Sequence, residues 1–456
     1  MGISHATLLI RHARIVDPAQ GIDRHGDVLV QEGTLVSLES HTDGCEGVPQ
    51  LDAKGCILCP AFVDLHCHLR EPGQEHKESI STGTRAAAAG GFCAVCCMPN
   101  TDPPLDTADI VRSFKQKLRR EACIQVLPVG AVSRRRAGQE LVDMEGLAAE
   151  GVVGLSDDGD PVATASLMRD ALYRSILFGL PIIDHCEDRS LVRDTFVNEG
   201  DVSLRLGVRG NPSAAEEIVL ARDLLLARAT QGRLHVAHVS TAGAVDMLRR
   251  ARNAGLAVTA EATPHHLLLT EDAVLQPESR AFDTNAKVNP PLRTEADRQS
   301  LLQALREGTI NVIATDHAPH AGFDKSRDPA SAAAGISEFE TAFGCLLGLV
   351  HSKQLSLATL ISRLTCDPAR LLGRQADLGT LRPGRAANLT LFDPEQGWTV
   401  DCRNFLSKGR NSPFDGWQLR GKVMLTVADG NVAYCDKRLA TAMPGDTLQS
   451  CQERRS

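Results

Sequence analysis

The sequence predicts an α/β fold, namely a (β/α)8 TIM-like barrel with a small β-sandwich domain built from both ends of the chain. Three observations predict it. The chain has 456 residues, which is more than one ordinary small domain needs. Its middle alternates short apolar runs with amphipathic segments eight times over roughly 300 residues, the pattern of β/α units. Its two ends carry short runs of alternating apolar and polar residues, broken by Gly, Asp and Pro, which are typical of antiparallel strands.

The two ends are expected to pair as one β-sandwich. Residues 1–59 contain the runs LLIRHARIVD, GDVLVQEGTLVSL and CILCP. Residues 371–436 contain ANLTLFD and GKVMLTVADGNVAYC, in which Asp429 begins an Asp-Gly hairpin signal. Residues 60–370 form the predicted catalytic barrel between them. Residues 437–456 form a polar tail without periodicity, which we expect to fray.

Eight strands and the helices between them make up the predicted barrel. The expected strands are Ala61–His66, Phe92–Met98, Ile124–Gly130, Gly151–Ser156, Pro181–Cys186, Arg233–Val239, Leu256–Glu261 and Ile310–Asp316. The expected helices are Ser79–Ala89, Ala163–Phe178, Ala214–Ala229, Ala242–Ala254, Glu295–Arg306 and Phe339–Val350. Active sites of such barrels lie at the carboxyl ends of the strands, so the residues that end each strand indicate the function.

The composition excludes two classes of partner. The 57 acidic and 49 basic residues give a net charge of −8 without blocks of like charge, so neither nucleic acid nor a membrane surface is indicated. No stretch approaches the ~20 continuous apolar residues of a membrane span. The N-terminus lacks the charged region, apolar core and cleavage site of a secretory signal. We therefore expect a cytoplasmic protein that acts on a small molecule.

Fourteen cysteines raise the question of disulfides or a zinc ribbon, because Cys56 and Cys59, and Cys93 and Cys96, form two C-x-x-C pairs. The gap between the pairs is far longer than the ~15–20 residues of a zinc ribbon. Each pair also lies in an apolar, strand-like run, where residues three apart face opposite sides. We expect free cysteines that act as small hydrophobic residues in a reducing compartment.

A metal site is indicated by the run PAFVDLHCHLREPG, from Pro60 to Gly73. It begins as an apolar strand and becomes polar at its end. Side chains alternate along a strand, so His66 and His68 point to the same face and can grip one metal ion. Arg70 follows at the same parity, where its guanidinium could hold a substrate carboxylate beside the metal. A His-x-His pair alone is more often a pair of surface residues without a metal, so the inference of a metal site depends on matching groups at the ends of the other strands.

The other predicted strands supply matching groups at their carboxyl ends. These are Asn100, the pair Asp157 and Asp158, His185, His238 and Asp316. Imidazoles with carboxylates favour zinc or another borderline divalent ion. The ligands outnumber the three of a single catalytic zinc site, so two ions that share a bridging carboxylate and a hydroxide fit better. The predicted reaction class is metal-assisted hydrolysis, or its reverse.

Longer blocks extend this pattern to a known family. The segments PAFVDLHCHLREPGQEHKE, MPNTDPP, SDDG, HCED, VAHVST, EATPHHLLLT, NAKVNPPLR, ATDHAPH and SKGRNSPFDGW together resemble the class I dihydroorotases of the amidohydrolase superfamily. The resemblance covers nearly the whole chain. It implies reversible interconversion of N-carbamoyl-L-aspartate and (S)-dihydroorotate in de novo pyrimidine (UMP) biosynthesis, with Zn2+ as cofactor, about two per chain.

The resemblance also assigns the metal ligands. His66, His68 and Asp316 would bind the more buried zinc, and His185 and His238 would bind the second. Many members of the superfamily bridge the ions with a carboxylated lysine, which this chain lacks. Asp158 is the preferred bridging ligand, with Asp157 as the alternative. Asp316 would also be the catalytic proton carrier.

Substrate contacts follow in the same way. The resemblance implies that Arg70, Asn100 and His320 bind the substrate carboxylate, and that Asn289 and the backbone at Ala334 and Gly335 bind the ring amides. One departure concerns the last of these positions. The loop reads Ala333-Ala334-Gly335, where the family pattern has a proline before the glycine, so its rigidity is open.

For several residues near the predicted ligands, a structural role is an alternative to a role in the site. Glu261 is expected to orient a metal-bound histidine, and His317 is expected to be structural. His265 and His266 could be a positioning pair or simply packed side chains, and a salt bridge on the barrel rim is favoured for Arg293.

Two other readings compete with an active dihydroorotase. One is a hydantoinase, dihydropyrimidinase or allantoinase, although those relatives usually have the carboxylated lysine and lack the clamp formed by Arg70 and Asn100. The other is a non-catalytic scaffold subunit of aspartate transcarbamoylase, which would be expected to have lost metal ligands. We expect a homodimer, with association with aspartate transcarbamoylase as a further partner interaction.

Overall fold

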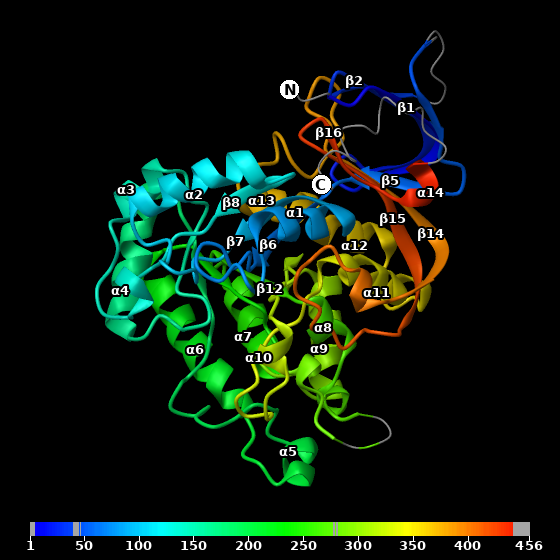
Figure 1. The fold of residues 1–456 in the computed structure, drawn as a ribbon. Coiled ribbons are helices and arrows are strands. Elements are labelled where there is room, and N and C mark those ends of the chain that lie inside the picture. Colours follow the sequence, from blue (N-terminus) through cyan, green and yellow to red (C-terminus); the bar gives the residue numbers. More distant parts are fainter. Residues whose placement is uncertain (1–4, 40–44, 46, 277–278, 280, 441–456) are drawn as a thin grey trace.

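The computed structural model describes residues 5–39, 45, 47–276, 279 and 281–440. It has two parts, a body of parallel strands wrapped by helices and a curved β domain that lies against one side of it (Figure 1). The fold is therefore of the α/β class, with a separate β domain, as the sequence predicts.

The β domain joins the two ends of the chain. Its strands are β1 (Leu8–Asp17), β2 (Ile22–Gln31), β3 (Thr34–Glu39), β4 (Gln50–Asp52), β5 (Ile57–Pro60), β14 (Leu389–Thr399), β15 (Gln418–Ala428) and β16 (Asn431–Cys435). They run in the order β16-β15-β14-β5-β1-β2-β3, with β4 beside β1. The antiparallel pair of β14 and β5 connects the end of the chain to its beginning.

The expected sandwich needs one correction, because these eight strands form a single hydrogen-bonded sheet and not two. The sheet is continuous because β5 pairs with β1 on one side and with β14 on the other. Its two arms still share one apolar core, to which Val28 of β2 and Leu425 of β15 both contribute. Burial of these side chains therefore holds the ends of the chain together.

The body contains eight parallel strands in two sheets. They are β6 (Phe62–Cys67), β7 (Phe92–Cys97), β8 (Gln125–Pro128), β9 (Leu155–Ser156), β10 (Ile182–Asp184), β11 (Leu234–Val236), β12 (Val258–Ala262) and β13 (Val312–Ile313). The order is β6-β7-β8 in one sheet and β9 to β13 in the other. Isolated parallel bridges join the sheets at both edges, between Gly130 and Leu155 and between Cys67 and His317.

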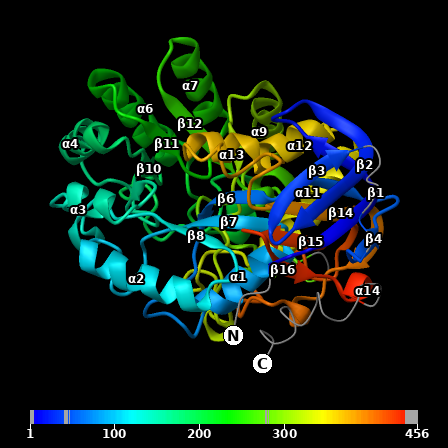
Figure 2. The ribbon, with the colours of Figure 1, turned by 90° about the horizontal axis from the view of Figure 1, so that it is seen from above.

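Helices surround these strands when the molecule is viewed from above (Figure 2). They are α1 (Ile80–Ala89), α2 (Ala108–Glu121), α3 (Met144–Ala149), α4 (Ala165–Ser175), α5 (Asp201–Leu206), α6 (Ser213–Thr230), α7 (Ala242–Asn253), α8 (Pro264–Leu268), α9 (Glu295–Glu307), α10 (Gly322–Lys325), α11 (Phe339–His351), α12 (Leu357–Leu364), α13 (Cys366–Leu371) and α14 (Lys437–Ala440). Short 3-10 segments lie at η1 (Arg134–Arg136), η2 (Ile176–Phe178), η3 (Glu271–Val274), η4 (Thr284–Ala286) and η5 (Cys402–Asn404).

Several of these helices begin at a hydroxyl side chain that ends the preceding loop. The side chains of Ser79, Thr107, Thr164, Thr241 and Thr294 accept a hydrogen bond from the backbone N–H three residues further on. Such a cap satisfies an N–H group that has no partner within the helix. The caps therefore determine where each helix begins. They also set the length of the loop between that helix and the strand before it.

The core of the body consists of the parallel strands and the inner faces of the helices. Strands β6 and β7 are buried along their whole length, as expected for parallel strands whose two faces are both covered. Cys93 and Cys96 are buried and free, and every cysteine in the described residues is free. The prediction of free cysteines is therefore confirmed for this part of the chain.

Within the described ranges, no helix combines the length and the apolar character that crossing a bilayer requires. The predicted polar tail begins with α14, and its remainder, residues 441–456, lies outside the described residues.

Candidate metal centre

A cavity of 250 Å³ opens at the carboxyl ends of the parallel strands. Its wall includes all the site residues predicted from the sequence except His66, which lies behind it: His68, Arg70, Asn100, Asp158, His185, His238, Asn289, Asp316, His320, Ala334 and Gly335. Residues from seven different loops therefore meet at one place, which is the arrangement that parallel strands produce at their ends.

The first cluster of possible ligands contains two imidazoles and two carboxylates. His66 lies on β6 and His68 directly follows it. Nε2 of His66 lies 3.3 Å from Oδ1 of Asp158 and 3.5 Å from Oδ1 of Asp316. Nε2 of His68 lies 2.9 Å from Oδ1 of Asp316 and 3.6 Å from Oδ2 of Asp158. Both rings thus direct the same nitrogen at the same pair of carboxylates.

The second cluster shares Asp158 with the first. His185 follows β10 and His238 follows β11, and Nδ1 of His185 lies 2.9 Å from Nε2 of His238. The same Nε2 lies 3.7 Å from Oδ1 of Asp158. Asp158 therefore lies between the two pairs of histidines, where a bridging ligand would have to be.

Asp157 has a different environment. Its Oδ1 accepts hydrogen bonds from the backbone N–H groups of Val132 (2.9 Å) and Ser133 (3.0 Å), and its Oδ2 accepts one from the Ser133 hydroxyl. In contrast, Oδ1 of Asp158 is buried without a hydrogen-bond partner. The structure thus separates the two candidates, because the oxygens of Asp157 are occupied within the protein and those of Asp158 face the histidines.

The two central carboxylates are ionised. Burial raises the pKa of Asp316, but the positive charge of the neighbouring His66 and the hydrogen bond from His68 outweigh it, and the net pKa lies below its ordinary range. The pKa of Asp158 is lowered in the same way, against burial, by His66 and His238. Both groups are therefore available as anionic ligands or proton acceptors.

The opposite wall of the cavity carries positive charge. The guanidinium of Arg70 donates from Nε to the carbonyl of Pro319 (3.2 Å), and its Nη2 lies 3.3 Å from Nε2 of His320. His320 is neutral, since burial and the charge of Arg70 lower its pKa to about 2. Arg70 is thus the cation of this wall, and it lines the same cavity as the candidate metal ligands.

Two predicted substrate residues also hold metal-ligand side chains. The amide oxygen of Asn100 accepts from Nδ1 of His68 at 2.9 Å, and Nδ2 of Asn289 lies 3.2 Å from Nε2 of His185. Ala334 and Gly335 both line the cavity. The N–H of Gly335 donates to the carbonyl of Lys287 (2.8 Å), so this group is used within the protein.

Comparison with known proteins places this cavity in context. Residues 55–244 match the family model described as Dihydro-orotase-like. The dihydroorotase of Geobacter sp. (strain M21) is 43% identical over 427 residues, which is 94% of this chain and 99% of that protein. The dihydroorotase of Geobacter metallireducens is 44% identical over the same shares of both chains. The chain belongs to the dihydroorotase family.

Solved structures with a similar fold include hydantoinases and dihydropyrimidinases. L-hydantoinase (dihydropyrimidinase) from Arthrobacter aurescens superimposes with a TM-score of 0.82 at 24% identity, over 93% of this chain and 95% of that one. Dihydropyrimidinase from Brevibacillus agri gives the same TM-score and identity over 95% and 96%. The dihydroorotase family member described here thus shares their overall fold.

The donor set of this cavity fits divalent cations. Nδ1 of His66 is 2.7 Å from Oε1 of Glu261 and donates to it, so Nε2 is the nitrogen that faces Asp158 and Asp316. Nε2 of His68 likewise faces these carboxylates, because its Nδ1 is bonded to Asn100. Each Nε2 needs a positive charge between it and the carboxylate oxygens, which is either a proton on the nitrogen or a metal ion in its place. Ligand atoms ~2.0–2.1 Å from a tetrahedral zinc would lie about 3.3 Å apart, inside the 2.9–3.7 Å range of the separations in the two clusters.

Glu261 orients the ligands from behind, as the sequence predicts. It bonds Nδ1 of His66 and Nε2 of His235 (3.1 Å), and it also accepts the backbone N–H of His238 (3.2 Å). Asp64 is a similar group that the sequence analysis missed. It accepts the backbone N–H (2.8 Å) and the hydroxyl (2.7 Å) of Thr315, which fixes the residue before Asp316. Asp64 lies two residues before His66, on the same face of the strand, and this spacing is the sequence pattern that could have indicated it.

His317, His265 and His266 bond to other groups of the protein. His317 accepts the N–H of Glu338 at Nδ1 and stacks on Phe339, as expected. His265 bonds Glu338 (2.8 Å), and His266 bonds Thr263 and the carbonyl of Pro290. The expected salt bridge of Arg293 is replaced by hydrogen bonds to Ser240, Asn198 and Asn211.

A third cluster of possible ligands lies behind His185 and has another explanation. Asp184, Cys186 and Asp223 are buried together. Nε of Arg222 donates to Asp223 at 2.7 Å, and burial and Asp184 hold the pKa of Asp223 well above its usual range. One proton and one guanidinium therefore balance these two carboxyl groups.

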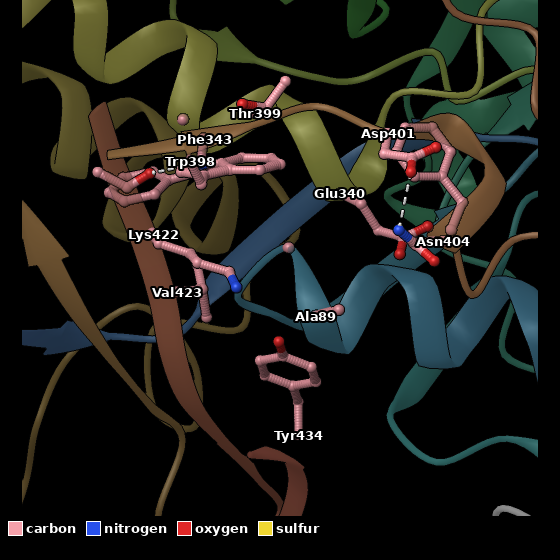
Figure 3. Close-up of a pocket in the computed structure, with 14 residues that line it drawn as sticks. Ala89, Glu340, Phe343, Trp398, Thr399, Asp401, Asn404, Lys422, Val423 and Tyr434 are labelled. Atoms are coloured by element: carbon pink, nitrogen blue, oxygen red, sulfur yellow. Dashed lines mark hydrogen bonds between the residues drawn. The ribbon is translucent and has the colours of Figure 1, made fainter. Parts of the chain in front are cut away.

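A second cavity, of 260 Å³, lies between α1, α11 and the β domain (Figure 3). Glu340, Trp398, Lys422 and Tyr434 line it, and none of the predicted site residues does. The carboxylate of Glu340 accepts the backbone N–H groups of Leu406 (2.8 Å) and Ser407 (3.2 Å). This cavity thus marks where the segment SKGRNSPFDGW is anchored to α11.

Proposed function

We propose that the chain is a metal-dependent dihydroorotase that reversibly interconverts N-carbamoyl-L-aspartate and (S)-dihydroorotate in de novo pyrimidine (UMP) biosynthesis. The observation that carries the proposal is the position of Asp158 between two pairs of histidines, with Arg70 on the opposite wall of the same 250 Å³ cavity. A small cyclic amide with a carboxylate would be in reach of both in a cavity of this size. Membership of the family supports the same reaction.

We propose two zinc ions per chain. His66, His68 and Asp316 would hold one ion, His185 and His238 would hold the other, and Asp158 would bridge them. When bound, such ions lower the pKa of water and polarise the amide carbonyl. Asn100 and Glu261 hold the tautomers of His68 and His66 that leave Nε2 free as a ligand atom.

The chain's own residues then bind the substrate and move the proton. Arg70, Asn100 and His320 would bind the carboxylate. Asn289 and the backbone of Ala334 and Gly335 would bind the ring amides, with the N–H of Gly335 already donated to the carbonyl of Lys287. Water adds to the ring carbonyl carbon and the ring C–N bond breaks. Asp316 takes the proton of the attacking water at its carboxylate and delivers it to the leaving ring nitrogen, and ring closure reverses these steps.

Hydantoinase or dihydropyrimidinase activity is the second candidate, because the solved structures with this fold carry those names. The chain has an aspartate at the bridging position and a buried arginine in the cavity, and uncharged ring amides have no group for that arginine to bind. A scaffold role without catalysis is disfavoured because the full set of expected ligands converges. Association with aspartate transcarbamoylase stays a prediction.

The deciding experiment is turnover of the purified chain with dihydroorotate, hydantoin, dihydrouracil and allantoin, with metal content measured on the same sample. We expect turnover of dihydroorotate alone and about one to two zinc per chain. Turnover of an uncharged ring at a higher kcat/KM would overturn the proposal in favour of the second candidate.

The finer architecture is also proposed. We infer that the eight parallel strands close into a (β/α)8 barrel within residues 60–370, which the bridges at both sheet edges support. Residues 1–59 and 371–436 would then form the β domain. Free cysteines throughout the described residues support a cytoplasmic location.

We propose that the assembly is a homodimer and that α6 forms its contact. The outer face of α6 carries apolar side chains four, three, four and four residues apart: Ala214, Ile218, Ala221, Leu225 and Ala229. Ile218 is 52% exposed and Leu225 is 57% exposed. We propose that a second copy covers this exposed apolar stripe, with the two α6 helices antiparallel about a two-fold axis.

A further inference from the structure

The loop from Ser326 to Gly335 brings Ala334 and Gly335 to the wall of the cavity, although its own side chains do little to hold it there. It follows α10 and reads SRDPASAAAG, with only alanine methyl groups near the site. Ser326, Arg327, Asp328, Ala330 and Ser331 are exposed. Burial of such small side chains stabilises a loop only weakly, so other contacts must determine its position.

Lys325 makes three of these contacts from inside the protein. The residue is 5% exposed, and its ammonium group donates to the carbonyl oxygens of Ala333 (2.8 Å), Gly335 (2.9 Å) and Lys287 (3.4 Å). An ammonium group has three N–H donors, and all three have acceptors here. Burial, together with the charge of Lys287, lowers the pKa of Lys325 to about 7. The carbonyl contacts offset the cost of keeping this charge buried.

Lys287 holds the other half of the loop. The residue is 8% exposed, and its Nζ donates to the carbonyls of Pro329 (2.7 Å) and Ala330 (2.9 Å). Its own carbonyl accepts the N–H of Gly335 at 2.8 Å. The two lysines therefore bind four carbonyls of one loop, two near its middle and two at its end.

The position of this loop affects the cationic wall of the cavity, because His320 contacts both the loop and Arg70. Nε2 of His320 lies 2.9 Å from the carbonyl oxygen of Ala334 and 3.3 Å from Nη2 of Arg70. Gly335 packs closely against Ala318, since its φ is 138° and a Cβ there would lie 2.6 Å from that of Ala318. A shift of the loop would thus displace His320 and Arg70 together.

We propose that Lys287 and Lys325 are positioning residues that hold this loop against the cavity and so keep the anion-binding wall in place for the substrate. Neither ammonium group lines the cavity, so neither acts on the substrate itself. The inference rests on the proposed dihydroorotase activity for its kinetic consequence, whereas the loop contacts do not depend on it.

The test compares Lys325→Met and Lys287→Met with the wild type and with Lys422→Met. Lys422 is a matched control because its Nζ bonds Asp436 (2.8 Å) in the β domain, away from the loop. Two quantities are measured on zinc-loaded protein of equal thermal stability: kcat and KM for dihydroorotate, and the rate at which trypsin cleaves after the exposed Arg327, identified by mass spectrometry.

We expect Lys325→Met to raise KM roughly tenfold with little change in kcat, because a loop released from its contacts must be ordered again by the substrate. Cleavage after Arg327 should become faster in both loop variants and stay unchanged in Lys422→Met. If Lys325→Met does not fold, Lys287→Met decides through the same two measurements.

Wild-type KM and wild-type cleavage in the folded loop variants would overturn the inference. A wild-type enzyme without dihydroorotase activity would instead refute the proposed function, and the cleavage rates would still decide whether the lysines hold the loop.

Discussion

Replacement of Glu261 by glutamine tests whether the buried carboxylate behind the cavity tunes the metal site. Burial raises the pKa of Glu261, but the neighbouring His66 and His235 lower it to about 2, so the group is anionic at neutral pH. It bonds His66 at 2.7 Å and His235 at 3.1 Å. Glutamine keeps the shape, removes the charge and offers one acceptor oxygen in place of two.

The expected loss follows from these contacts. His235 can adapt to the amide by exchanging its ring proton, since its Nδ1 also has a partner in Thr259 (2.8 Å). His66 cannot adapt without turning its ligand nitrogen away. Loss of one charge-assisted hydrogen bond costs about 1.5–3 kcal/mol, so zinc should bind roughly 10–100-fold more weakly.

The measurement is zinc affinity by competition with a chelator, on protein whose fold is checked by circular dichroism. Glu338→Gln is the matched control, because Glu338 is equally buried and bonds His265 (2.8 Å), which is not a proposed ligand. Equal zinc affinities for Glu261→Gln and the wild type, or an equal loss in the control, would refute the reasoning.

Four further substitutions test individual roles. Asp158→Ala should abolish zinc binding, whereas Asp157→Ala should keep the metal and lose about 1–3 kcal/mol of stability; metal analysis with thermal denaturation separates them, and zinc loss in the second variant alone would reverse the assignment. Arg70→Met should raise KM for dihydroorotate roughly 30-fold or more at unchanged zinc content, and an unchanged KM would remove this residue from the substrate site. Asp316→Asn should keep the fold and lose roughly 10²–10⁴ in kcat; near wild-type turnover would exclude it as proton carrier. Leu225→Glu should give a monomer by light scattering, and a persisting dimer would place the contact elsewhere.

The fold was predictable where local pattern decides it. All eight parallel strands lie within the apolar runs expected for them or within one residue of those limits, because such strands are buried on both faces. The runs overestimate strand length: β9 is Leu155–Ser156, whereas the expected strand began at Gly151. Helix α2 was missed although Val111, Phe114 and Leu118 give it an apolar face and Thr107 caps it. The single sheet of the β domain depends on pairing between distant strands, which periodicity does not encode.

The candidate site was predictable in its ligand types and only partly in their partners. Alternation along β6 predicts that His66 and His68 face the same way, and the structure has them facing the same carboxylates. Spacing alone left Asp157 and Asp158 open. The choice between them depends on Ser133, whose hydroxyl donates a hydrogen bond to the Asp157 carboxylate from a loop 24 residues away in the sequence. Such a contact follows from the folded arrangement and from no local pattern.

Asn411 shows why the substrate side is the harder half to predict. Its Oδ1 accepts the backbone N–H of His320 (2.9 Å), and its Nδ2 donates to the carbonyls of Ala318 (3.1 Å) and Gly335 (2.9 Å). One amide thus ties Ala318 and His320 to Gly335, from a segment anchored to α11 by Glu340. Metal ligands belong to a few residue types and have to converge on one point, so histidines and aspartates at the ends of several strands can be recognised in a sequence. The groups that place a substrate are held by neutral amides and carbonyls, which occur everywhere in a sequence and acquire meaning only through distance.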